Sequence, residues 1–80
     1  MKQTYFETQL AAIDAAIIGA EDRGFEVVIP TTCWADHVAY GTTVKYTLDL
    51  VKAGKPQRKA LVISLYRMES GKYELTDYIN

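Results

Sequence analysis

Several residue types and segment kinds are scarce in this chain of 80 residues, and each scarcity excludes a class of protein. A single cysteine cannot form an internal disulfide, whereas small secreted domains usually contain several, so we expect a reducing, cytoplasmic setting. No apolar run approaches the roughly 20 residues that span a bilayer. The opening segment MKQTYFETQL also lacks the apolar stretch of a signal peptide. We therefore expect neither export nor a membrane partner.

Groups that carry chemistry are also scarce. The chain has one histidine, His37, and one cysteine, Cys33, with Asp36 between them. A cysteine–histidine pair could form a thiolate nucleophile oriented by the aspartate, but neighbours in a short loop rarely reach that geometry. A metal site needs three or four ligands, and the five glycines are scattered rather than gathered in a phosphate-binding loop. We therefore expect no enzyme, no cofactor and no metal.

What is present is the composition of a folded protein, 49% hydrophobic and 24% charged, which excludes a disordered chain. A chain of this length has room for one core between two layers, so we expect a single domain over residues 1–80. The net charge of −1 gives no overall attraction to nucleic acid or to an anionic membrane. Charge is uneven, because residues 1–40 carry six acids and two bases, whereas residues 41–80 carry seven bases and four acids.

The first element that the pattern predicts is an amphipathic helix from about Tyr5 to Arg23. The segment Thr4–Glu7 fits the Ser/Thr-x-x-Glu capping box. Apolar residues then recur at helical spacing, and these are Phe6, Leu10, Ile13 and Ile17, with Ala12, Ala16 and Ala20 widening the same stripe. Gly24 suits the left-handed position after a helix. We expect Leu10 in the core and Ile18 exposed.

The rest of the chain predicts a four-stranded antiparallel sheet with the helix on one face, an α+β fold in the order α-β-β-β-β. A first strand, Phe25–Ile29, is stopped by Pro30. From Val38 to Leu50, even positions are mostly apolar and odd positions small or polar, which indicates one buried face. The strand Ala60–Met68 is apolar on both faces and therefore central, and Lys72–Ile79 follows it.

Two turns set the expected register. The segment Glu69–Gly71 fits a three-residue hairpin loop with a left-handed glycine. The pairs that follow from this loop are Met68–Lys72, Leu65–Leu75 and Leu61–Ile79. The segment Gly54–Gln57 is expected to form a four-residue loop that pairs Leu50 with Leu61, since a one-residue slip would turn a whole strand inside out.

The sheet face away from the helix is the first candidate site. One helix covers one face, and antiparallel sheets often leave the other face to water. The candidate binding residues on this face are Val62, Tyr66, Met68 and Tyr78, with Lys45, Lys72 and Glu74 around them. The expected register puts Lys45 in one row with Tyr66 and Glu74. A mixed aromatic, polar and charged surface is typical of transient interfaces, and the alternative is an ordinary solvated face.

Two further features are candidate sites. The bases Lys52, Lys55, Arg58 and Lys59 cluster at a hairpin, which is either a solvated tip or a contact for a phosphate or an acidic partner. Trp34 lies in the connector Thr31–His37 and either closes the open end of the core or forms a binding hot spot.

A helix followed by a four-stranded meander, with no catalytic groups, resembles small phage-encoded accessory proteins of the anti-CRISPR kind in size and layout. The resemblance implies a stoichiometric inhibitor of a larger host defence complex, and no family residue carries over. We therefore expect a non-enzymatic protein-binding module. The alternative is a single-stranded nucleic-acid-binding domain that stacks bases on Tyr66 and Tyr78 and holds phosphates with the basic hairpin. The pI of about 5.7 counts against it. A homodimer through the free sheet face or a free edge is compatible with both.

Overall fold

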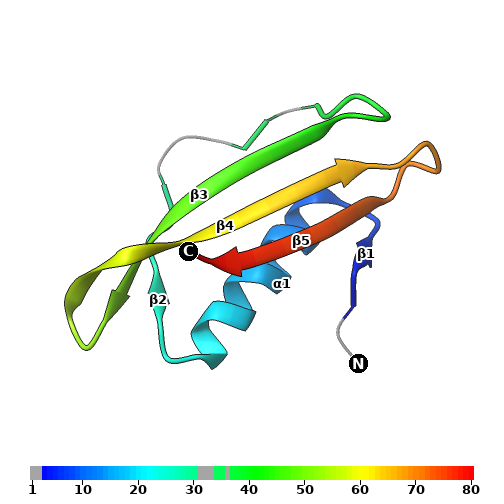
Figure 1. Cartoon of the computed structure of the whole chain (residues 1–80). Helices are drawn as coiled ribbons and strands as arrows, with labels where there is room; N and C mark the ends of the chain where they lie inside the picture. The colour runs from blue at the N-terminus through cyan, green and yellow to red at the C-terminus, as the bar shows by residue number, and fades with distance from the viewer. Residues whose placement is uncertain (1–2, 31–33, 36) are drawn as a thin grey trace.

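The described residues form one helix and five strands, and every strand pair among them is antiparallel (Figure 1). The computed structural model describes residues 3–30, 34–35 and 37–80. The elements are β1 (Tyr5–Phe6), α1 (Gln9–Asp22), β2 (Glu26–Val27), β3 (Thr43–Lys52), β4 (Lys55–Arg67) and β5 (Tyr73–Ile79). The sheet order is β1-β5-β4-β3-β2, so α1 joins its two edge strands. The predicted α+β class is confirmed, and the described strands number five rather than four.

The additional strand precedes the helix, where the sequence predicted the first helical turn. Thr8 caps α1, because its side-chain oxygen accepts the N–H of Ala11 at 3.1 Å. Tyr5 and Phe6 instead pair with Glu74 and Tyr73 of β5. The predicted helix start at Tyr5 was therefore wrong by four residues. Residues 5–6 form a strand instead of a helical turn because the strand buries the Phe6 ring while leaving Tyr5 at the surface.

The end of the helix is close to its predicted place. Gly24 has a φ of 90°, as expected of the left-handed residue that follows a helix. The N–H of Phe25 reaches back to the carbonyl of Ala20 at 3.2 Å, and that of Gly24 to Glu21 at 2.9 Å. This pair of bonds is a Schellman motif, and it satisfies carbonyls that the last turn leaves unpaired.

The buried face of α1 agrees with the predicted stripe in Ile13 and in the three alanines, and differs from it at Leu10. Its buried residues are Ala12, Ile13, Ala16 and Ala20. Leu10 is 59% exposed, so its predicted place in the core was wrong, whereas Ile18 is exposed as expected. Because Phe6 belongs to β1, the line of alanines sets the helix orientation and turns Leu10 away. Small side chains let the helix approach the sheet closely.

The β4–β5 hairpin has the predicted register. Leu65 pairs with Leu75 and Leu61 with Ile79, and the N–H of Met68 bonds to the carbonyl of Lys72 at 2.9 Å. Gly71 has a φ of 93°, the left-handed conformation that a three-residue loop requires.

The β3–β4 hairpin is tighter than predicted. Its turn is the pair Ala53 and Gly54, both left-handed with φ of 52° and 75°, as in a type I′ turn. The register of the pairing shifts between Asp49 and Val51. On the side of this shift away from the turn, Leu48 lies opposite Leu61. The predicted Leu50–Leu61 pair was therefore wrong by two positions, which leaves every side chain on its expected face. The prediction failed because Pro56 was assigned to the turn, whereas it lies in β4 opposite Val51.

Other predicted strand limits also need correction. The strand expected at Phe25–Ile29 is reduced to Glu26–Val27, and β3 begins at Thr43 rather than Val38. The largest fully buried side chains are Ile13, Leu50, Leu61, Ile63 and Leu65, which pack between the helix and the sheet. No described helix is long and apolar enough to cross a membrane.

Candidate functional site

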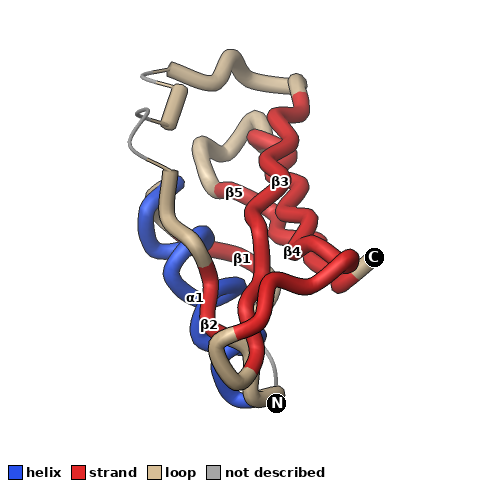
Figure 2. Tube along the Cα trace, turned by 90° about the vertical axis from the view of Figure 1, so that its left-hand side faces the viewer, coloured by secondary structure: helices blue, strands red, loops and turns tan. Residues whose placement is uncertain are grey.

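The two faces of the sheet have different surroundings. The helix and the segment that follows β2 lie on one side, and no described element covers the opposite side, which we call the outer face (Figure 2). Alternation along the strands assigns the odd positions of β3 and the even positions of β4 and β5 to the outer face. The predicted face assignment of Tyr66 and Tyr78 follows from this alternation and the observed register.

One row across the outer face consists of Tyr5, Glu74, Tyr66 and Thr43 on four neighbouring strands. Tyr5 is 48% exposed and Tyr66 is 39% exposed, while Glu74 between them is partly buried. Side chains directly opposite one another on such strands have Cβ atoms about 4.5–5.5 Å apart. The row therefore places a carboxylate between two phenol rings.

A second row contains Tyr78, Val62 and Thr47. Tyr78 is 44% exposed, whereas Val62 is only 6% exposed and does not belong to the core cluster beneath the sheet. Val62 is therefore buried by its neighbours on the outer face itself. We call Tyr5, Val62, Tyr66 and Tyr78 the outer tyrosine face.

A polar row of Thr76, Ser64 and Lys45 separates these two rows. The prediction that Lys45 lies beside Tyr66 and Glu74 was wrong, because the two-residue β3–β4 turn and the register shift between Asp49 and Val51 together displace β3 by two positions from the predicted pairing. Lys45 thus lies between the rows rather than at one end of them.

The remaining predicted residues lie at the β4–β5 turn. Met68 is partly buried there, opposite Lys72. The Lys72 ammonium lies 3.6 Å from a carboxylate oxygen of Glu7, and both side chains are well exposed. An exposed ion pair of this kind contributes little to stability, so both charges are available at the rim of the face.

Sequence reasoning missed Tyr5, because it placed this residue in the helix. The signal was present in the chain, since Thr8 is an equally good helix cap and Tyr5 and Phe6 can alternate between the two faces of a strand. Val28, which belongs to the predicted strand Phe25–Ile29, continues the β2 pairing, because its N–H bonds to the carbonyl of Asp49 at 2.9 Å. Its side chain is exposed.

Trp34 packs against the core cluster and makes an edge-on contact with Tyr46, with ring centroids 4.9 Å apart. The Tyr46 hydroxyl donates a hydrogen bond to Oε1 of Gln9 and accepts one from the N–H of Ala35. The amide of Gln9 in turn donates to the Ala35 carbonyl at 2.8 Å. This network ties the connector to α1 and β3, which favours the interpretation of Trp34 as a residue that closes the open end of the core.

The basic hairpin lies at the other end of the molecule from the β4–β5 turn, and its four bases are exposed. The Lys52 ammonium lies 5.1 Å from the centre of the Phe25 ring, on the side of the sheet where the helix ends. The structure therefore does not gather Lys52 with Tyr66 and Tyr78 on one surface. The single-stranded nucleic-acid interpretation, which uses both features, stays a prediction.

Of the Cys33–Asp36–His37 group, which the sequence did not favour as a catalytic site, Cys33 and Asp36 lie outside the described residues. Within the described ranges, no pocket opens and no three metal-ligating side chains gather. Comparison with protein-family models, curated proteins and solved structures finds no match for this chain.

Proposed function

We propose that this protein is a non-enzymatic binding module that docks another protein on the outer tyrosine face of its sheet. The observation that carries this proposal is the group of half-exposed Tyr5, Tyr66 and Tyr78 on a face that no described element covers. Tyrosine is enriched at protein interfaces because one ring combines a large apolar area with a polar hydroxyl.

The backbone beneath these rings favours the same function. The tyrosines project from paired strands, and two of these strands, β4 and β5, pair along the whole of β5. Rings on such a frame lose little conformational freedom on binding, because each has only two side-chain torsions and a fixed backbone. Glu74 and Lys45 lie among the tyrosines and Lys72 lies at the β4–β5 turn, so the face combines aromatic with charged groups, as protein interfaces often do.

The partner class remains part of the proposal. By its resemblance to small phage-encoded inhibitors, we place the protein among stoichiometric inhibitors that cover a functional surface of a larger host complex. An inhibitor of this kind acts by covering a surface, so it needs a complementary shape and complementary charges, and it needs no reacting group.

The test compares two double substitutions of exposed apolar side chains. Tyr66→Ala/Tyr78→Ala alters the outer face, and Leu10→Ala/Ile18→Ala alters the exposed side of the helix, where the residues are 59% and 55% exposed. The tagged chain is used to capture its partner, and affinities of the purified pair are then measured by calorimetry. We expect the tyrosine double to weaken binding by about 2 kcal/mol or more, roughly 30-fold, and the helix double to leave it unchanged.

Melting temperatures of both doubles provide the control for folding, and we expect them to stay close to that of the parent. Equal binding by the two doubles would contradict the proposal. Light scattering of the purified chain adds a second check. If the tyrosine double converts a dimer into a monomer, a second copy of this chain covers the face instead of another protein.

A further inference from the structure

We propose that the tip of the β3–β4 hairpin, residues Lys52–Lys59, is a second binding site that takes the phosphate backbone of nucleic acid. The observation that carries this proposal is that four exposed cationic side chains lie close together on the two strands of one hairpin. The proposal goes beyond the docking of a protein on the outer tyrosine face and does not depend on it.

The charge of the hairpin is of one sign. The bases are Lys52, Lys55, Arg58 and Lys59, and no acid occurs between Leu50 and Leu61. None of the four makes an ion pair with a described residue. Since the whole chain has a net charge of −1, the other residues together carry −5, and the positive charge is concentrated at this tip. Two acids lie beside the base of the hairpin, since Glu26 pairs with Val51 and Asp49 with Ala60. Screening at physiological salt limits the effect of acids more than about 8 Å away.

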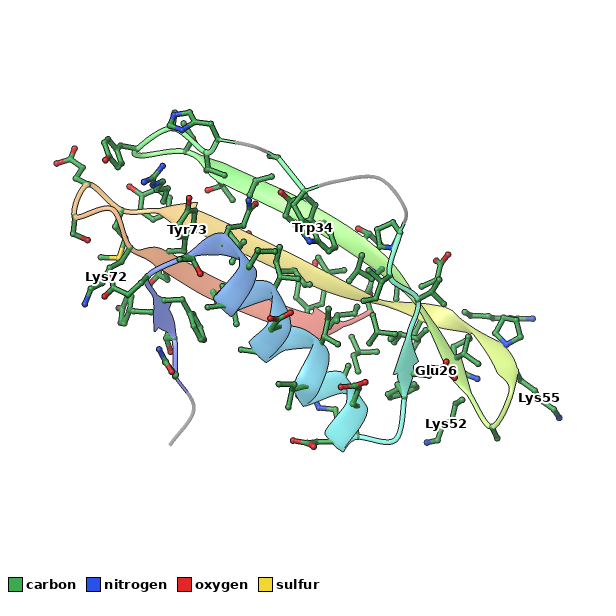
Figure 3. The ribbon with its side chains drawn as sticks, turned by 180° about the vertical axis from the view of Figure 1, so that it is seen from behind. Glu26, Trp34, Lys52, Lys55, Lys72 and Tyr73 are labelled. Atoms are coloured by element: carbon green, nitrogen blue, oxygen red, sulfur yellow. The ribbon has the colours of Figure 1, made fainter. Side chains whose placement is uncertain are left out.

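The hairpin extends past the end of the helix, so its tip can reach a partner without the body of the protein intervening (Figure 3). Figure 3 shows Lys55 pointing outward from the tip, whereas Lys52 leans back toward the helix end. The contact of Lys52 with the Phe25 ring anchors the base of the ribbon. Lys55 and the bases that follow it remain available to a ligand.

Two features of the tip oppose its own stability. Lys52 lies directly opposite Lys55 in the register, and like charges at opposed positions of a hairpin are unfavourable. Ala53 also adopts a left-handed conformation that glycine or asparagine would occupy at lower cost. An anion bound at Lys55 would reduce the repulsion between the two lysines, and local energetic costs of this kind concentrate at functional sites.

The side chains of the tip favour phosphate over an acidic protein. Between Lys52 and Lys59 the other residues are Ala53, Gly54, Pro56 and Gln57, so the aromatic and large apolar anchors of protein hot spots are missing. Lysine is depleted in protein interfaces, whereas lysine and arginine make most contacts to phosphate oxygens. A two-stranded ribbon also has the width that the major groove of duplex DNA admits.

The experiment is a fluorescence-anisotropy titration of a labelled duplex, and of its separated strand, with the full chain at several salt concentrations. The test variant is Arg58→Glu/Lys59→Glu, and the matched control, with the same change in charge, is Lys45→Glu/Lys72→Glu. We expect the test variant to lose about 10-fold or more in affinity and the control less than about 3-fold. The slope of log K against log salt for the parent chain on the duplex should lie between about −2 and −3.6, because each of at most four contacted phosphates contributes about −0.9.

Other outcomes overturn the proposal. These are no anisotropy change at low salt, equal losses in the two charge-reversed variants, or a salt slope near zero. The proposal would also be overturned if polyglutamate competed as effectively as unlabelled oligonucleotide. That result would indicate an acidic protein as the partner of the hairpin. Tyr66→Ala/Tyr78→Ala serves as a further arm and should bind the oligonucleotide like the parent, so failure of this proposal is distinguishable from failure of the outer tyrosine face. Circular dichroism of each variant checks its fold.

Discussion

The two faces of the sheet use the same strands for different purposes. On the inner face the side chains of Leu61, Ile63 and Leu65 are fully buried beneath the helix. On the outer face the alternate positions of the same strand hold Val62 and Tyr66, and the tyrosine remains 39% exposed. Stability is therefore concentrated on one face, and the exposed side chains of the other face can change with little effect on folding.

The clearest way to break this comparison is to truncate two neighbours on β4 that point to opposite faces. Ile63→Ala should lower the free energy of unfolding by about 2–5 kcal/mol, because it leaves a cavity in the main core. Val62→Ala removes less volume from a site buried only by surface side chains and should lower it by about 1–2 kcal/mol. Urea denaturation measures both. Equal losses would mean that the outer face is part of a second core.

A matched pair in the helix sharpens the same contrast. Ile13 is 1% exposed, so Ile13→Ala should lower the free energy of unfolding by about 2–4 kcal/mol. Leu10→Ala should change it by less than about 0.5 kcal/mol, since Leu10 is exposed and alanine is a good helix former. Thermal melts followed by circular dichroism provide the measurement. A large loss for Leu10→Ala would restore the helix face that the sequence spacing predicted.

These helix residues show where sequence reasoning succeeded and where it could not. The helix itself, its left-handed Gly24 and the β4–β5 register follow from local signals, and all three are confirmed. The helix start was ambiguous, because Thr4 and Thr8 are both good caps. The choice between them depends on the pairing of β1 with β5, a contact between residues nearly 70 positions apart. No local pattern contains that information.

The candidate site shows the same division. Period-two alternation suffices to assign Tyr66 and Tyr78 to one face, and a two-position error in register leaves that assignment intact. The neighbours of each residue are more sensitive, so Lys45 was placed in the wrong row and Tyr5 was missed. Whether the outer face binds a partner stays a prediction, since sequence patterning describes exposure and not occupancy.

The two faces also differ in how they use a tyrosine hydroxyl. Tyr46 donates to Gln9 and accepts from Ala35, so Tyr46→Phe should lower the free energy of unfolding by about 1–2 kcal/mol. Tyr66 on the outer face makes no hydrogen bond to another described residue, so Tyr66→Phe should leave stability within about 0.5 kcal/mol of the parent. Chemical denaturation of the two variants side by side checks the difference. Equal effects would show that the connector network does not stabilise the fold.

The smallest expected effect concerns the β3–β4 turn, which belongs to neither face. Ala53 is left-handed with a φ of 52° and precedes Gly54, and Asn-Gly is the pair that type I′ turns prefer. Ala53→Asn should therefore raise the free energy of unfolding by about 0.5–1 kcal/mol, because asparagine tolerates this conformation better than alanine. The gain should appear in urea denaturation with an unchanged slope and without altered exposure of the tyrosines. A loss of stability would instead support the predicted four-residue loop Gly54–Gln57. In that loop residue 53 belongs to the strand and does not adopt a left-handed conformation. The register of β3 would then shift by two positions, and Lys45 would return to the row of Tyr66 and Glu74.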